Sequence, residues 1–98
     1  MYKLIYTAAA RKDYQKAKNS SLLVKIMELL AILETNPFQS PPSYERLIGN
    51  LNGAFSRRIN RQHRLVYEIA DNSSGFKDQS GELYEGIVKI IRFWTHYE

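Results

Sequence analysis

Cysteine is absent from the 98-residue sequence, which excludes disulfide bonds and zinc sites built on thiolates. Only two histidines are present, His63 and His96, and their separation is not typical of a metal-ligand pair. No apolar run approaches the roughly 20 residues that a membrane-spanning helix requires. Segment 1–15 does not predict a signal peptide, because its apolar stretch is short and charges follow it at once. We therefore expect a cytoplasmic bacterial protein with no membrane association, no metal and no cofactor.

The length predicts a single domain over residues 1–98, because independent domains are commonly about 100–150 residues long. The formal net charge is +4, with a pI near 9.4. This charge is compatible with a polyanionic partner such as nucleic acid, but many basic domains bind none. The arrangement of the charges is therefore more informative than their sum.

The first half of the sequence predicts a strand followed by two helices. Residues 1–6 favour a strand, and Thr7 is a suitable N-cap for a helix over 8–18. A second helix is expected over 21–35, where apolar residues recur at intervals of three and four. They form one stripe that we expect to pack in the core: Leu22, Leu23, Ile26, Met27, Leu30 and Leu33. Asn36 ends this helix, because the residue before a proline is disfavoured in the α conformation.

The second half predicts three strands. Segments 54–59 and 63–70 are separated by three polar residues, which is typical of a hairpin. Segment 71–85 is a hydrophilic loop, interpreted as an insertion between the last two strands, and 86–97 is β-branched and aromatic. The resulting order, β-α-α-β-β-β, predicts an α+β fold in which two N-terminal helices pack on one face of an antiparallel sheet.

The densest group of charges surrounds the predicted hairpin. Segment 56–64 (SRRINRQHR) contains four arginines, namely Arg57, Arg58, Arg61 and Arg64. The planar guanidinium group matches phosphate oxygens in a bidentate manner, so these residues are candidates for RNA or phosphate binding. A solvated strand edge whose charges oppose aggregation is the alternative explanation.

RNA cleavage without a metal ion needs three chemical groups. A base removes the proton of the 2′-hydroxyl, a cation stabilises the crowded phosphorane, and an acid protonates the leaving 5′-oxygen. A carboxylate, an arginine and a histidine can fill these roles. Aromatic side chains can stack on bases and hold the substrate in line.

The arrangement of motifs resembles the YoeB/Txe branch of the RelE/ParE toxin superfamily. The resemblance covers nearly the whole chain, in order, and rests on segments 25–30, 36–38 (NPF), 44–47 (YERL), 50–59 (NLNGAFSRRI), 63–67 (HRLVY) and 96–97 (HY). It implies a microbial-ribonuclease-like fold and the toxin of a type II toxin–antitoxin system. It also implies metal-independent cleavage of mRNA in the ribosomal A site, which inhibits translation until a cognate antitoxin neutralises the toxin.

The same resemblance implies a role for each candidate residue. Glu45 is expected to be the general base, Arg64 the ligand of the phosphate and transition state, and His96 the general acid. Tyr97 would orient the RNA, while Arg57 and Arg58, with Arg61 beside them, would contact phosphates. The expected partners are the antitoxin, the bacterial ribosome and mRNA. Association of two copies into a homodimer stays open.

Two alternatives use the same fold. A ParE-like toxin would inhibit gyrase by binding it, without needing a carboxylate, arginine, histidine and tyrosine together. A non-catalytic RNA-binding module would keep its activity when Glu45 or His96 is replaced, and lose it when Arg57 and Arg58 are reversed in charge. A metal nuclease is the least favoured, because the sequence has no clustered group of carboxylates or histidines.

Replacing His96 by alanine should lower the single-turnover rate of RNA cleavage on ribosomes by about 100-fold or more, the scale of losing an acid–base partner. Quenched-flow measurement with end-labelled mRNA would give this rate. A variant that cleaves at the wild-type rate would remove His96 from the role of general acid.

Overall fold

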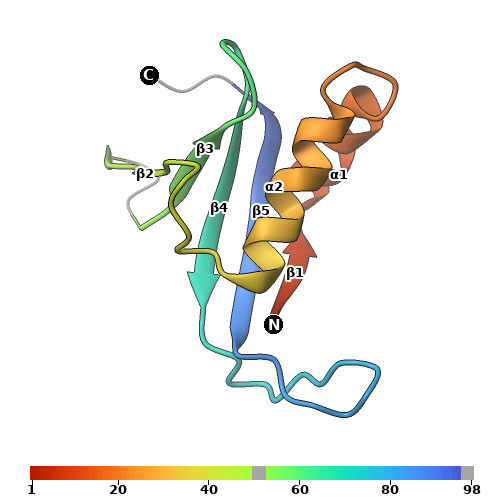
Figure 1. Cartoon of the computed structure of the whole chain (residues 1–98), viewed down its shortest axis with the longest axis vertical. Helices are drawn as coiled ribbons and strands as arrows, with labels where there is room; N and C mark the ends of the chain where they lie inside the picture. Colours follow the sequence, from red (N-terminus) through yellow and green to blue (C-terminus); the bar gives the residue numbers. More distant parts are fainter. Residues whose placement is uncertain (50–52, 96–98) are drawn as a thin grey trace.

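The computed structural model describes residues 1–49 and 53–95. Its elements follow the chain as shown in Figure 1: β1 (Tyr2–Tyr6), α1 (Ala8–Ala17), α2 (Leu23–Thr35), β2 (Glu45–Arg46), β3 (Phe55–Arg58), β4 (Arg64–Ala70) and β5 (Gly86–Thr95). The predicted order of strands and helices is confirmed. Strand β2 was not predicted, because its two residues are too few to show the alternation of apolar and polar side chains that indicates a strand.

The strands form one mixed sheet in the order β1-β5-β4-β3-β2. Strands β2 to β5 pair antiparallel in succession, as expected, but β1 runs parallel to β5. The expectation of a purely antiparallel sheet is therefore wrong at β1. The reason lies in the connection: the two helices carry the chain from β1 at one edge to β2 at the other. β1 therefore has no hairpin partner, and it pairs with β5, from which almost the whole chain separates it; parallel neighbours need such a long connection, whereas antiparallel neighbours can be joined by a hairpin.

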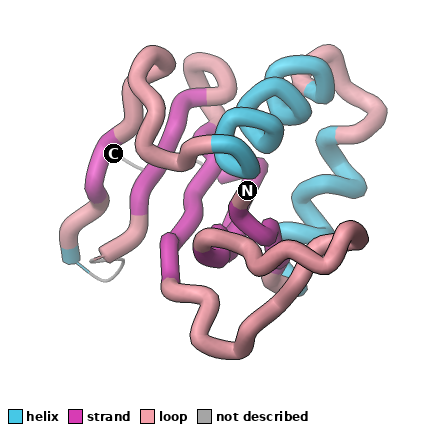
Figure 2. Tube along the Cα trace, turned by 60° about the horizontal axis from the view of Figure 1, so that its bottom comes forward, coloured by secondary structure: helices cyan, strands magenta, loops and turns pink. Residues whose placement is uncertain are grey.

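The core lies between the two helices and the sheet, and Figure 2 shows the helices together beside the strands. Its buried apolar members are Ala10, Ala17, Ile26, Leu29, Leu30, Leu33, Ile59, Leu65, Tyr67, Val88, Ile90 and Phe93. Most of the predicted α2 stripe is therefore internal or packed against it. Leu23, which is half-buried, and Met27, which is 50% exposed, are not among these residues. No helix in the described part of the chain is long and apolar enough to cross a membrane.

The alternation of side chains divides the sheet into two faces. In β4, Leu65 and Tyr67 belong to the core, so Arg64 and Val66 project from the opposite face. In β3, the Arg57 side chain contacts Tyr67 on the core side. The side chains of Ser56 and Arg58, the adjacent residues, therefore project from the opposite face. We call this second surface, which the helices do not cover, the open face.

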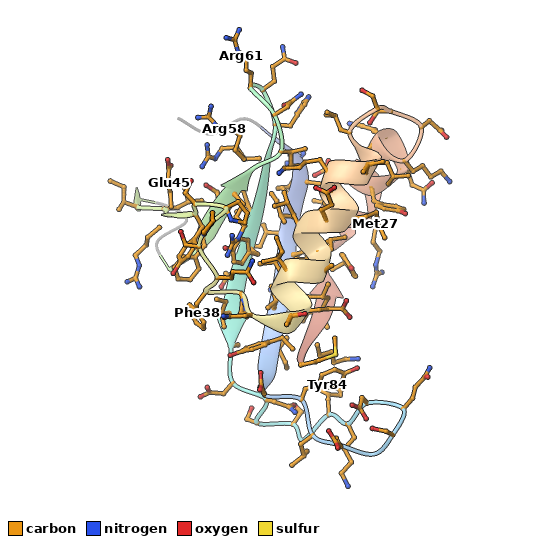
Figure 3. All side chains as sticks on the ribbon, viewed as in Figure 1. Met27, Phe38, Glu45, Arg58, Arg61 and Tyr84 are labelled. Atoms are coloured by element: carbon orange, nitrogen blue, oxygen red, sulfur yellow. The ribbon has the colours of Figure 1, made fainter. Side chains whose placement is uncertain are left out.

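The loop over 71–85 joins β4 to β5 and is fastened by local contacts. The Asn72 side chain donates to the carbonyls of Phe76 and Tyr84 and accepts from the Phe76 N–H. The Lys3 ammonium lies 5.1 and 5.6 Å from the ring centres of Phe76 and Tyr84. Figure 3 places Tyr84 near one end of the molecule and Arg61 at the other. The loop thus lies at the end of the sheet remote from the arginine-rich hairpin.

An ion pair fixes the last part of β5 against α1. The Asp13 carboxylate accepts from Arg92 Nε at 2.6 Å and Nη2 at 3.1 Å, and also from the Phe93 N–H at 3.1 Å. Thr7, which caps α1, donates its hydroxyl to the Ile91 carbonyl at 2.8 Å. These contacts lie where the pairing of β4 with β5 shifts register. They therefore hold the strand end that leads into the C-terminal segment.

Replacing Asp13 by alanine should lower the free energy of unfolding by about 2–4 kcal/mol, because the pair is partly buried and Arg92 would lose its counter-charge. Urea denaturation followed by circular dichroism measures this change. The exposed Asp71 offers a control, and its replacement by alanine should change stability by less than about 0.5 kcal/mol. Equal unfolding midpoints for the two variants would contradict a structural role for the ion pair.

Candidate active site

Strand pairing brings the predicted base and the predicted phosphate ligand together. Glu45 in β2 is opposite Ser56 in β3, and Arg58 in β3 is opposite Arg64 in β4. Side chains at these positions share the open face, where neighbours on adjacent strands lie within reach of one another. Residues 45 and 64 are distant in the sequence, and only this register makes them neighbours.

Arg64 is held by two contacts. Its Nε donates to Ser56 Oγ at 2.9 Å, and its Nη2 lies 3.3 Å from Glu45 Oε2. The Arg64 side chain is only 13% exposed, whereas that of Glu45 is 67% exposed. The buried Ser56 hydroxyl therefore orients the guanidinium group from within, while the carboxylate meets it at the surface. This arrangement places a negative and a positive catalytic candidate side by side at an accessible position.

Ser56 is a site residue that the sequence analysis left without a role. Ser56 is fully buried on β3, and its hydroxyl oxygen accepts a hydrogen bond from Arg64 on the open face. In a hairpin with Arg58 opposite Arg64, Ser56 is two residues before Arg58 on the same face of β3, so it is the diagonal neighbour of Arg64. Counting this register from the predicted turn would have identified the contact.

Further cations surround the Glu45–Arg64 pair. Arg58 is exposed at the end of β3, and Arg61 is exposed in the hairpin connection, as Figure 3 shows. Arg46 is exposed on β2, with its guanidinium 5.3 Å from the ring centre of Phe55. With Arg64, Arg58 and Arg61 make a basic rim suited to phosphate groups, whereas Arg46, opposite Phe55, lies on the other face of the sheet. Arg46 had not been singled out, because only the formation of β2 brings it beside β3.

Arg57 does not belong to this rim, and the expectation that it contacts phosphate is corrected by its position. Its side chain is fully buried on the core side of β3. Nε donates to Tyr67 Oη at 3.0 Å, and the two terminal nitrogens donate to the carbonyls of Pro37, Gln39 and Pro42 at 2.7–2.9 Å. The guanidinium group is thus already satisfied by protein oxygens and has no surface that RNA can reach.

Burial at the same place changes the acidity of Tyr67. The pKa of its phenol is raised above the usual value, chiefly because burial disfavours the charged phenolate. The Arg57 cation and its hydrogen bond act in the opposite direction and only partly compensate. Tyr67 therefore remains a neutral acceptor for Arg57 across the physiological pH range.

His96 and Tyr97, the predicted acid and RNA-orienting residue, lie outside the described residues. The described part of β5 ends at Thr95, which pairs in register with Arg64. The backbone immediately preceding His96 in the sequence is therefore opposite the Arg64 position. Within residues 1–49 and 53–95, no three His, Asp or Glu side chains are grouped as a metal site would require.

Comparison with known proteins identifies a family and several solved structures that this chain is similar to. A family model described as the YoeB-like toxin of bacterial type II toxin–antitoxin systems matches residues 6–79. The chain is 39% identical to Toxin YoeB from Synechocystis sp. over 71 residues, which cover 70% of this chain and 83% of that relative. A solved YoeB/ParE toxin from Agrobacterium tumefaciens superposes with a TM-score of 0.77 at 26% identity, covering 97% of this chain and 99% of its own.

Two structures from Staphylococcus aureus show similar toxins in assemblies. The chain matches a YoeB–YefM complex at 29% identity and a TM-score of 0.69, with 99% of each chain covered. It also matches a YoeB dimer at 28% identity and a TM-score of 0.70, with 98% of each chain covered. The fold seen here thus occurs both in a toxin–antitoxin complex and in a dimer.

Replacing Arg64 by lysine should reduce single-turnover RNA cleavage by at least about tenfold, because a point charge cannot bind Ser56 and a phosphate as the planar fork does. The exposed Arg58 provides the matched control. Arg58→Lys keeps the charge at a rim position and should change the rate by less than about threefold. Equal rates for Arg64→Lys and wild type would indicate that residue 64 supplies charge alone.

Proposed function

The chain belongs to the YoeB-like toxins of bacterial type II toxin–antitoxin systems, and on this premise we propose that it is an endoribonuclease that cuts mRNA in the ribosomal A site. The observation that carries the proposal is the Glu45–Arg64 pair, 3.3 Å apart on the open face, with the exposed Arg58 opposite Arg64 on the neighbouring strand. A general base and a phosphate ligand at this separation match the needs of 2′-hydroxyl attack on a phosphodiester.

In the proposed reaction, Glu45 accepts the proton of the 2′-hydroxyl as its oxygen attacks the adjacent phosphorus. Arg64 binds the non-bridging oxygens, whose negative charge grows in the phosphorane. His96 donates a proton to the 5′-oxygen as the bond from phosphorus to that oxygen breaks. The products are a 2′,3′-cyclic phosphate and a free 5′-hydroxyl, so atoms and charge balance without an added reactant. Tyr97 is assigned to holding the RNA in line.

The ion pair must open for this reaction, and the exposure of the Glu45 carboxylate lowers the free-energy cost of opening it. Ion pairs at the protein surface typically contribute only about 0–1 kcal/mol to stability. The Glu45 side chain is mostly exposed, so an incoming phosphate can replace its carboxylate on the guanidinium group. This exchange releases Glu45 to act as a base at the moment when substrate binds. Ser56 keeps Arg64 in place throughout, because it holds the Nε edge.

The basic rim supports binding to the ribosome. Exposed arginines at positions 58 and 61 lie near the catalytic pair and can contact phosphates of mRNA or ribosomal RNA. With a net charge of +4, the chain should bind RNA less tightly as salt concentration rises. Contacts of this kind position the toxin and carry no sequence information by themselves.

The partners follow from the family. We infer that a cognate antitoxin neutralises this toxin in the bacterial cytoplasm, as expected for a type II system. The Staphylococcus aureus complex and dimer support antitoxin binding and self-association as assemblies that this fold can enter. The proposed activity needs no residue from a second copy, because Glu45, Ser56 and Arg64 come from one chain.

The direct test is a purified translation reaction programmed with a defined mRNA, in which new 5′ ends are mapped. Wild-type protein should produce ends within the A-site codon, and Glu45→Gln should lower their rate of appearance by about 100-fold. Glu68→Gln is the control, because Glu68 is an exposed carboxylate elsewhere on β4 and should leave the rate unchanged. Cleavage should persist in EDTA for as long as the ribosomes remain intact.

Intact mRNA from a protein that still arrests growth would reject the ribonuclease and favour gyrase or another protein target. Undiminished cleavage by Glu45→Gln, with ends still at the A site, would retain the ribonuclease but remove Glu45 as its base.

A further inference from the structure

Arg57 binds the chain segment that leads into the candidate site. Three carbonyl oxygens, from Pro37, Gln39 and Pro42, converge on its terminal nitrogens. Tyr67 accepts from Nε, so all three nitrogens of the guanidinium group donate to oxygen acceptors. A fully buried cation needs such a shell, since an unsatisfied one would be strongly destabilising.

The segment that Arg57 binds has few other means of adopting a fixed path. Prolines at 37, 41 and 42 lack an N–H group, so the segment cannot form a continuous strand or helix. Its carbonyls instead point toward one buried side chain. The guanidinium group thereby replaces the backbone partners that a regular element would supply.

The next residues along the chain connect this contact to the catalytic pair. The Tyr44 ring lies over the guanidinium group, 4.8 Å from its centre, and meets the Phe55 ring edge-on at 5.8 Å. Glu45 follows directly and is paired with Ser56, although β2 is only two residues long. So short a strand contributes little pairing of its own, and the position of Glu45 depends on the segment before it as well as on the Leu47 N–H, which donates to the Ala54 carbonyl at 2.8 Å.

We propose that Arg57 is a positioning residue for Glu45. By holding the carbonyls of residues 37–42 and the Tyr44 ring, it sets the path of the chain into β2 and keeps the Glu45 carboxylate beside Arg64. The inference rests on the proposed function, in which Glu45 is the general base. Arg57 itself touches no RNA and acts only through the segment that it holds.

A double-mutant cycle tests this coupling. Arg57→Lys keeps a buried cation but loses the fork that spans three carbonyls. In the wild-type background it should lower single-turnover cleavage by about 100-fold, the scale expected when a catalytic group is misplaced by about 1 Å. In the Glu45→Gln background, Arg57→Lys should lower the single-turnover cleavage rate by less than about threefold, because the base is already absent. An equal loss in both backgrounds would overturn the proposal.

Amide hydrogen exchange supplies a readout that does not depend on RNA cleavage. In Arg57→Lys, the amides of the non-proline residues in 39–46 should exchange at least about tenfold faster, while those of α1 and β4 keep their protection. Tyr67→Phe is the control for lost stability alone: it leaves the buried Nε donor without its acceptor and should lower the free energy of unfolding by about 1–3 kcal/mol, but it keeps the three carbonyl contacts, so the cleavage rate and the relative protection of residues 39–46 should be preserved. Unchanged exchange in 39–46 would overturn the positioning role even if the wild-type protein proved inactive on mRNA.

A second variant covers the case in which Arg57→Lys fails to fold. Tyr44→Leu removes the ring above the guanidinium group and leaves Arg57 in place. It should lower the maximal cleavage rate by about tenfold or more without changing the half-saturating ribosome concentration. A wild-type maximal rate for Tyr44→Leu would overturn the proposal.

Discussion

The strict alternation of side chains along β3 is the constraint on which the site depends. Ser56 projects toward the open face and accepts from Arg64, whereas Arg57 projects into the interior and binds the carbonyls of the loop before β2. One short strand therefore orients Arg64, the proposed phosphate ligand, from one side and the segment that carries Glu45, the proposed base, from the other. A shift of one residue in its register would exchange these two faces.

The contrast between Arg57 and Arg64 shows that environment, more than residue type, decides what an arginine does. Arg57 is fully buried and its donors are consumed by protein oxygens, so its charge contributes to structure. Arg64 is fixed along one edge by Ser56 and retains a second edge, which at present faces the exposed Glu45 carboxylate. A side chain that is half fixed and half available is preorganised for a phosphate without being blocked by its own protein.

Much of this could be predicted from local patterns, and the remainder depends on contacts between distant segments. Apolar spacing and Asn36-Pro37 located α2, and the polar residues 60–62 located the hairpin between β3 and β4. The parallel placement of β1 beside β5 could not be predicted from alternation, because alternation does not specify a strand's partner. The burial of Arg57 was missed for a related reason: its acceptors are backbone carbonyls, which no sequence motif reveals.

The central claim is that Arg64 exchanges Glu45 for the scissile phosphate while Glu45 turns to the 2′-oxygen. A structure of the toxin on a ribosome whose A-site codon carries 2′-O-methyl nucleotides, which block cleavage, tests it most directly. The account predicts the Arg64 guanidinium on the phosphate adjoining the modified sugar, with a Glu45 carboxylate oxygen next to that sugar's 2′-oxygen. An Arg64–Glu45 pair that remains closed, with the phosphate bound elsewhere, would contradict it.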